Sequence, residues 1–225
     1  MNGGTLSVVA TPIGNLEDMT LRALRTLKEC DVIYAEDTRV ISKLLARYEI
    51  KKPLQRLDAA TEEKKAGEII ERLEAGEHVV YVSDAGTPGV SDPGARLVAH
   101  VRAQSPSMRI EAIPGASALT ALLSIAGLES TGFTFLGFLP HKKGRQTALK
   151  EIAASALPTI VYESPHRIEK LLGEAKALGI RTITIGRELT KVHEEVVSGT
   201  PEDIEAHFRE HSDRLRGEFV VILIP

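Results

Sequence analysis

The sequence is poor in cysteine and in aromatic residues. Cys30 is the single cysteine among 225 residues, which excludes an intramolecular disulfide and a cysteine metal cluster and suits a reducing compartment. Aromatic side chains are limited to four Tyr and five Phe, with no Trp. This scarcity argues against ligand recognition through rows of stacked rings.

Long hydrophobic runs and an excess of basic charge are also missing. The first residues, Met-Asn-Gly-Gly-Thr, lack the pattern of a signal peptide, and no apolar run approaches the roughly 20 residues that span a bilayer. We therefore expect a soluble, intracellular, cytoplasmic protein. The net charge of −3 gives the chain no overall basic character, so we expect a polyanionic partner to bind a local patch of basic residues.

Several familiar catalytic motifs are absent from the sequence. It contains no G-x-x-x-x-G-K-[ST] phosphate loop, G-x-G-x-x-G turn, G-x-S-x-G elbow or H-E-x-x-H helix. The common families of kinases, dehydrogenases and hydrolases are therefore disfavoured.

What the sequence does contain is an alternation of short β-branched runs with stretches of helical period, which predicts an α/β protein. In the first half we expect a mostly parallel sheet, with strands at residues 5–10, 31–36, 78–83 and 108–113 and helices near 21–28, 40–47, 61–74 and 95–103. In the second half we expect strands at 133–139, 159–163, 181–188 and 218–224 and helices near 147–156, 168–178 and 201–211. We place two α/β domains at residues 1–116 and 117–225, with a soft boundary in the apolar helix at 116–125.

Ligands of open α/β sheets bind beyond the carboxyl ends of the strands, so the residues at those ends are the informative ones. The first strand is followed by a loop with Pro12 and Gly14, which is a tight turn or a ligand contact. The second is followed by Glu36, then by Asp37 or Thr38 as a helix cap. Arg39 opposes the helix dipole there, which predicts an anion opposite it: Glu36, Asp37 or a substrate phosphate.

The third strand is followed by the strongest local signal, the Gly-rich segment 83–94. Its second part has a structural explanation, because Ser91 or Asp92 caps a helix that Pro93 begins. Its first part, from Asp84 to Gly89, is longer than a connection requires, which suggests backbone groups shaped around a ligand.

Two more strand ends and one loop complete the set of candidates. Residues 113–117 leave room for a bulky ligand or for close helix packing. In segment 162–167, Ser164 as a cap and Pro165 as the first helical residue would place His166 and Arg167 in the first turn, which indicates an anion site. The connection 139–145 is the densest basic stretch and is expected to be exposed, either as a binding patch or as a solvated loop.

Five motifs together resemble a known family. Ala-Thr-Pro-Ile-Gly-Asn-Leu at 10–16, Ala-Glu-Asp-Thr-Arg at 35–39, Ser-Asp-Ala-Gly-Thr-Pro-Gly-Val-Ser-Asp-Pro-Gly at 83–94, Pro-Gly-Ala-Ser-Ala at 114–118 and Tyr-Glu-Ser-Pro-His-Arg at 162–167 are similar to those of bacterial 16S ribosomal RNA cytidine ribose 2′-O-methyltransferases. These are a branch of the tetrapyrrole-methylase superfamily of class III methyltransferases. The resemblance covers nearly the whole chain, and Gly14 as the single glycine of the first loop matches the ribosomal RNA branch.

The resemblance implies two α/β domains with an S-adenosylmethionine cleft between them, a homodimer, and a cytidine ribose on the small ribosomal subunit as substrate. Neither a metal nor a second cofactor is implied. We expect the cofactor to be held by Pro12, Gly14, Asp84, Gly86, Thr87, Gly89, Val90, Gly115, Ala116, Ser117 and Tyr162. We expect RNA to be bound by Arg39, Lys142, Lys143, Arg145, His166 and Arg167.

A ribose hydroxyl is a weak nucleophile, so a base or an orienting acceptor would help the reaction. The candidates are Glu36, Asp37 and Glu163, each of which could instead pair with Arg39 or Arg167 as scaffold. Three other functions remain open: a same-fold methyltransferase of a small molecule such as a tetrapyrrole, a non-catalytic RNA-binding assembly factor, and an unrelated nucleotide-binding enzyme. The basic loop disfavours the small-molecule methyltransferase, and the scarcity of aromatic residues disfavours the RNA-binding assembly factor. The five motifs disfavour the unrelated nucleotide-binding enzyme.

Overall fold

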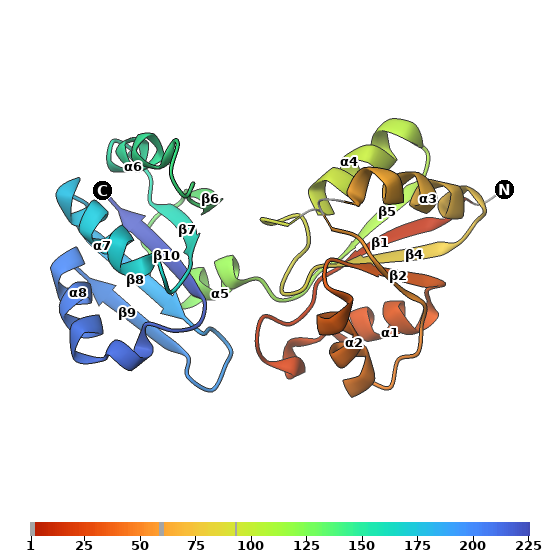
Figure 1. The fold of residues 1–225 in the computed structure, drawn as a ribbon, viewed down its shortest axis with the longest axis horizontal. Helices are drawn as coiled ribbons and strands as arrows, with labels where there is room; N and C mark the ends of the chain where they lie inside the picture. The colour runs from red at the N-terminus through yellow and green to blue at the C-terminus, as the bar shows by residue number, and fades with distance from the viewer. Residues whose placement is uncertain (1–2, 59–60, 93) are drawn as a thin grey trace. The chain divides into compact units, whose positions relative to one another are not determined.

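The structure is a computed structural model that describes residues 3–58, 61–92 and 94–225. The chain divides into two compact units, Met1–Ser117 and Ala118–Pro225, each built around its own sheet (Figure 1). In the described part of the chain, no helix combines the length and the apolar character needed to cross a membrane.

The first unit contains a five-stranded sheet in the order β3-β2-β4-β1-β5, in which every neighbouring pair is parallel. Its strands are β1 Thr5–Val9, β2 Val32–Ala35, β3 Leu54–Arg56, β4 His78–Val82 and β5 Arg109–Ile113. The predicted strands are confirmed with ends shifted by about one residue. β3 was not predicted, because its three residues, Leu-Gln-Arg, show no apolar run.

Two helices cover each face of this sheet (Figure 1). The helices are α1 Leu21–Glu29 and α2 Thr38–Arg47 on one face, with the short η1 Leu16–Asp18, and α3 Glu62–Glu74 and α4 Gly94–Gln104 on the other. Because both faces are covered, successive strand residues are buried alternately against the two helix pairs. In β4, for example, Val80 packs with Leu27 and Ile41, whereas Tyr81 packs with Leu97.

The second unit has a five-stranded sheet in the order β6-β7-β10-β8-β9, in which only β6 and β7 are parallel. Its strands are β6 Thr134–Phe138, β7 Thr159–Glu163, β8 Thr182–Arg187, β9 Glu195–Gly199 and β10 Phe219–Ile224. β9 was missed by the sequence analysis, because it lies at an edge and alternates half-buried with exposed residues. The unit is therefore mixed, unlike the first.

Three helices of the second unit pack on one face of its sheet and α5 contacts β10. The helices are α5 Ala118–Ile125, α6 Arg145–Ala153, α7 Ile168–Ala177 and α8 Pro201–Glu210, followed by the short η2 Ser212–Arg214. α8 starts where the chain has Thr200 before Pro201, and a capping box joins Thr200 and Asp203. Local sequence thus fixes where this helix begins.

Candidate active site

The loops after β1 and β4 are joined at the carboxyl edge of the first sheet. The main chains of Thr11 and Gly86 form a bridge, with the Thr11 amide 3.0 Å from the Gly86 carbonyl and the reverse pair at 3.1 Å. The Thr11 hydroxyl also donates to the carbonyl of Ser83 at 3.1 Å. These bonds fix the Gly-rich loop against the segment that contains Pro12.

The loop after β5 joins the same cluster. The Thr87 hydroxyl donates to the carbonyl of Ala116 at 3.0 Å, and the Ala10 amide donates to that of Ile113 at 3.1 Å. A Cβ atom on Gly115 would lie 3.0 Å from the Ala10 Cβ. Four of the predicted cofactor residues, Gly86, Thr87, Gly115 and Ala116, therefore come together, as the position of the strand ends predicts.

Gly86 is required by its backbone as well as by space. Its φ is +83°, where side chains are disfavoured, and a Cβ would lie 3.1 Å from Ile13 Cγ2. Of the other predicted cofactor residues in this unit, Pro12 is buried, Ser117 is half-buried and Gly14 is exposed. The three loops thus bring glycines and main-chain groups together at this edge.

Asp92 holds the Gly-rich loop together through hydrogen bonds, whereas the sequence predicted it only as a possible helix cap. Its carboxylate accepts hydrogen bonds from the amides of Gly89 at 2.7 Å, Val90 at 3.3 Å and Gly94 at 2.7 Å. The amides of Gly89 and Val90 therefore hold the loop together. Pro93, expected to begin the helix, lies outside the described residues.

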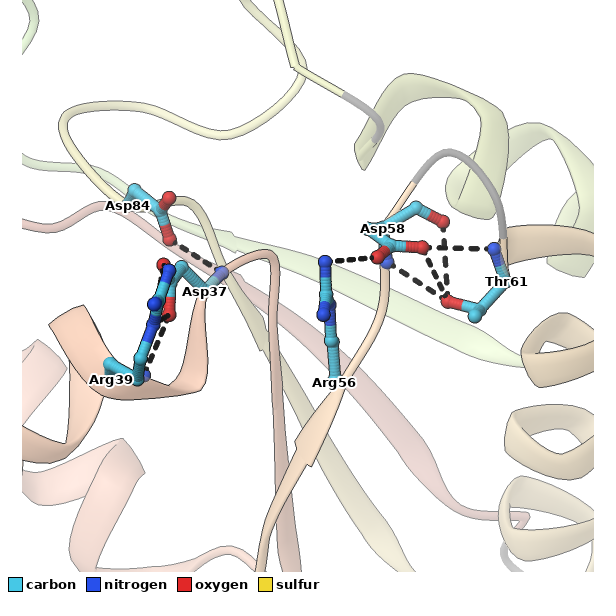
Figure 2. A network of polar contacts seen from close by, with 6 residues as sticks. All are labelled: Asp37, Arg39, Arg56, Asp58, Thr61 and Asp84. Carbon is cyan, nitrogen blue, oxygen red and sulfur yellow. Dashed lines mark hydrogen bonds and ion pairs between the residues drawn. The ribbon is translucent and has the colours of Figure 1, made fainter.

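The anion opposite Arg39 is Asp37 (Figure 2). Asp37 caps α2 by accepting the Arg39 amide at 2.8 Å, and its carboxylate receives the Arg39 Nε at 2.9 Å. Hydrogen bonds from the Arg39 side chain and amide lower the pKa of Asp37 far below its usual value. A carboxylate held in this state is a weak base, and the Arg39 side chain stays 87% exposed.

Glu36 is in the opposite situation although it is the preceding residue. Burial first, and then the negative charges of Asp84, Asp92, Asp58 and Asp37, raise the pKa of this half-buried carboxyl. Within residues 3–58, 61–92 and 94–225, its side chain has no hydrogen bond or ion pair. Glu36 is therefore a stronger base than Asp37, and it is the least engaged of the three candidate carboxylates.

Asp84 and Asp58 connect the neighbouring loops at this edge (Figure 2). Asp84 accepts the main-chain amide of Asp37 at 2.9 Å, and burial, together with the charges of Asp37 and Asp92, raises its pKa. Asp58, after β3, pairs with Arg56 at 2.7 Å and accepts the Thr61 hydroxyl at 2.8 Å. Arg56 is an exposed cation that the sequence analysis missed, because its strand was not recognised.

In the second unit, the third candidate base is fully engaged. The Glu163 side chain is completely buried and accepts Arg145 Nη1 at 3.3 Å, Arg167 Nη2 at 3.0 Å and the Ser164 amide at 2.8 Å. Arg145 also donates through Nε to Glu174 at 2.8 Å. Burial opposes the charge of Arg145, but its contacts with Glu174 and Glu163 outweigh this effect and raise its pKa.

Two expectations about this cluster are wrong. Arg145 was expected in the exposed basic loop, yet its side chain is 3% exposed, because it pairs with buried carboxylates. Ser164 is not a side-chain cap and Pro165 is not the first helical residue, because α7 begins at Ile168, where the helix at 168–178 was predicted. The anion beside Arg167 is Glu163, the pairing that the sequence analysis gave as an alternative. His141, Lys142 and Lys143 are exposed as expected, and His166 is exposed as well.

Tyr162, the cofactor candidate of the second unit, is half-buried in β7. Its ring meets those of Phe135 and Phe138 edge to face, with centroids 5.1 Å and 5.6 Å apart. Phe138 itself is 56% exposed. These rings form a small aromatic group beside the start of the basic loop.

Sequence comparison places residues 5–205 in a match to the family described as Tetrapyrrole (Corrin/Porphyrin) Methylases. Ribosomal RNA small subunit methyltransferase I of Neisseria meningitidis serogroup B is 43% identical over 225 residues, which cover 99% of this chain and 77% of that protein. The protein of the same name from Thermotoga maritima is 40% identical over 221 residues, which cover 98% of each chain.

Solved structures show the same fold at lower identity. Uroporphyrin-III C-methyl transferase from Thermus thermophilus, complexed with S-adenyl homocysteine, has a TM-score of 0.64 and 21% identity, covering 99% of this chain and 97% of that one. Diphthine synthase has a TM-score of 0.74 and 18% identity, covering 98% and 89%. Both likenesses extend over the two units.

Proposed function

Because the chain belongs to the tetrapyrrole (corrin/porphyrin) methylase family, we propose that it is an S-adenosylmethionine-dependent methyltransferase of small-subunit ribosomal RNA. The observation that carries the substrate is the 40–43% identity, over nearly the full chain, to proteins named ribosomal RNA small subunit methyltransferase I. We propose further that it methylates the ribose 2′-hydroxyl of a cytidine in the 16S decoding centre, as its five motifs imply.

The first unit fits the proposed cofactor. Gly86 and Gly115 contribute no Cβ atom to this edge, and a hydrogen bond from Thr87 to Ala116 ties the two loops together, so the main chain at the two glycines can approach a ligand closely. When bound, S-adenosylmethionine supplies an electrophilic methyl group. The loops contribute position, and orientation of reacting groups can lower a barrier by roughly 7–11 kcal/mol.

Among the candidate bases, we assign the role to Glu36. Its raised pKa and its lack of a partner in the described part of the chain suit a carboxylate that accepts the ribose hydroxyl proton on an oxygen atom. Asp37, paired with Arg39, and Glu163, paired with two arginines, are scaffold instead. Proton transfer to Glu36 would raise the nucleophilicity of the hydroxyl oxygen as the methyl group moves to it.

We propose that exposed cations bind the RNA. We propose also that the chain works in the cytoplasm as a homodimer. Arg39 and Lys142 with Lys143 supply exposed charges for phosphates. Self-association is supported by apolar side chains on and near the edge strand β6, where Phe133, Leu136 and Phe138 are 43%, 46% and 56% exposed. Light scattering of the wild-type protein and of Leu136→Glu tests this, and a wild-type monomer would contradict it.

The function is tested by transfer of a labelled methyl group from S-adenosylmethionine to small subunits that lack the modification, followed by nucleoside analysis. Free 16S RNA and a tetrapyrrole precursor serve as parallel acceptors. We expect label on a cytidine ribose of the subunit. Label on the tetrapyrrole alone would keep the enzyme class and overturn the RNA substrate.

A further inference from the structure

The exposed basic loop, residues 140–144, is anchored at its start by the half-buried Arg167 and at its end by the buried Arg145. At its start, Arg167 Nη2 donates to the carbonyl of Leu139 at 2.7 Å. At its end, the Arg145 guanidinium reaches Glu163 and Glu174. Leu139 and Arg145 are buried, while all five residues between them are exposed.

Both anchors meet on one carboxylate. Glu163 Oε1 lies 2.9 Å from Arg167 Nε, and its Oε2 accepts Arg167 Nη2 at 3.0 Å and Arg145 Nη1 at 3.3 Å. The Ser164 amide donates to Oε1 at 2.8 Å. Glu163 thus connects the end of β7, the first residue of α6 and the residue before α7.

We propose that Glu163 is a positioning residue that fixes the basic loop, through Arg145 and Arg167, in the shape in which Lys142 and Lys143 meet the phosphates of a folded RNA. This inference rests on the proposed function. It gives the two arginines a different task from direct RNA binding, because their charges are already neutralised by Glu163 and Glu174.

The arrangement favours a positioning role over a purely stabilising one. Buried ion pairs are poor stabilisers, and apolar side chains of similar volume often serve a core equally well. This cluster instead uses one of its donors on the main chain of Leu139, the residue before the loop. At the other end of the loop, Gly144 has a left-handed φ of +88° and is followed directly by Arg145 of the cluster.

The lysines are available for a partner. Lys142 and Lys143 are exposed, and neither side chain has an ion pair or hydrogen bond in the portion of the chain that the structure describes. Two long side chains on a fixed loop lose less conformational freedom when they bind than the same side chains on a mobile loop. By fixing the loop, Glu163, Arg145 and Arg167 would therefore preorganise Lys142 and Lys143 as a phosphate site.

The test is a double-mutant cycle on binding of small subunits lacking the modification. The variants are E163Q, K142A/K143A and all three changes together, with R187K as the matched control. Arg187 forms a comparable buried pair with Glu195, at 3.2 Å, which makes no contact with the basic loop. Thermal unfolding and S-adenosylmethionine affinity are measured for every variant, and R145K replaces E163Q if the latter does not fold.

We expect E163Q to weaken RNA binding, to lower its salt dependence as K142A/K143A does, and to leave cofactor affinity unchanged. In the E163Q background, the lysine changes should cost at least about threefold less affinity than in the wild type, because coupled residues are non-additive. Faster hydrogen exchange of the main-chain amides of residues 141–145 in E163Q should accompany the loss, and R187K should bind RNA normally.

Additive effects of the two sets of changes, or normal RNA affinity of folded E163Q and R145K, would overturn the positioning role alone. A wild-type chain that binds neither subunits nor free 16S RNA would overturn the proposed function itself. The two failures are therefore distinguishable by the wild-type measurement.

Discussion

The carboxylate of Asp84 accepts a hydrogen bond from the main-chain amide of Asp37 at 2.9 Å, which joins the loop after β4 to the residue that caps α2. The two acids repel each other through their charges, yet the amide of one satisfies the carboxylate of the other. One bond therefore controls both the Gly-rich loop and the start of α2.

Replacing Asp84 should separate these two effects. Asp84→Ala removes the acceptor of the Asp37 amide and should lower the free energy of unfolding by about 1–2 kcal/mol. Asp84→Asn keeps an acceptor oxygen and removes one charge from the acidic group, so it should be at least as stable as the wild type at neutral pH. Urea unfolding of both variants measures the difference, and equal losses would contradict it.

Glu36→Gln should abolish most of the methyl transfer while leaving cofactor binding intact. A general base contributes about 100- to 10,000-fold, and the amide cannot accept the proton. Single-turnover transfer to small subunits gives the rate, and titration with S-adenosylmethionine gives the affinity. Asp37→Asn is the matched control, and a larger loss there would move the base to that residue.

The same Glu36→Gln variant should be more stable than the wild type at neutral pH. Because the folded protein raises the pKa of Glu36, ionisation is less favourable in the folded state than in the unfolded one. The two proteins should unfold alike below about pH 4.5, the usual value for this carboxyl. The advantage of Gln should grow as the pH rises through the folded pKa, and a constant difference in thermal unfolding across pH would refute this origin.

Gly86→Ala and Gly76→Ala should destabilise the protein similarly but differ in function. Both glycines have a left-handed φ, +83° and +90°, so either alanine should cost about 1–2 kcal/mol. A Cβ on Gly86 would also press on Ile13, whereas Gly76 has open space. Only Gly86→Ala should weaken S-adenosylmethionine binding in calorimetry, and equal affinities would remove the loop from the cofactor site.

Arg39→Ala should weaken RNA binding and reduce its dependence on salt by about one ion, as loss of one phosphate contact predicts. Its thermal stability should change little, because the pair with Asp37 is exposed. Arg47→Ala, at the other end of α2, is an exposed control. An equal effect of both changes would indicate general attraction rather than a contact.

The parts of the site that depend on neighbouring residues in sequence were predictable. A cap at Asp37 or Thr38, an anion beside Arg39 and a Gly-rich turn between Asp84 and Gly89 follow from backbone rules that need no tertiary information, and the structure has Asp37 as the cap. The loops after β1, β4 and β5 lie together because neighbouring parallel strands end at the same edge of the sheet, where ligands of such sheets bind.

The parts that depend on distant residues were not predictable. From the sequence, Arg145 is predicted to be one more cation of an exposed loop. In the structure it pairs with Glu163 and Glu174, which lie 18 and 29 residues away in the sequence. The pair of Arg167 with Glu163, four residues before it, was among the alternatives that the sequence left open, but nothing local shows that Arg145 shares the same carboxylate. Tertiary pairing decided these positions against local propensity.

The place of β1 between β4 and β5 in its sheet has a consequence for synthesis of the chain. Thr5 pairs with His78 on one side and with Arg109 on the other, so the first strand must wait for both partners to be translated. At about 5–20 residues per second, that wait lasts from about 5 to about 20 s. Both edges of β1 stay unpaired until β4 has been made, and the edge that pairs with β5 stays unpaired for the whole interval, so the apolar segment with Leu6, Val8 and Val9 is open to pairing with other chains during synthesis.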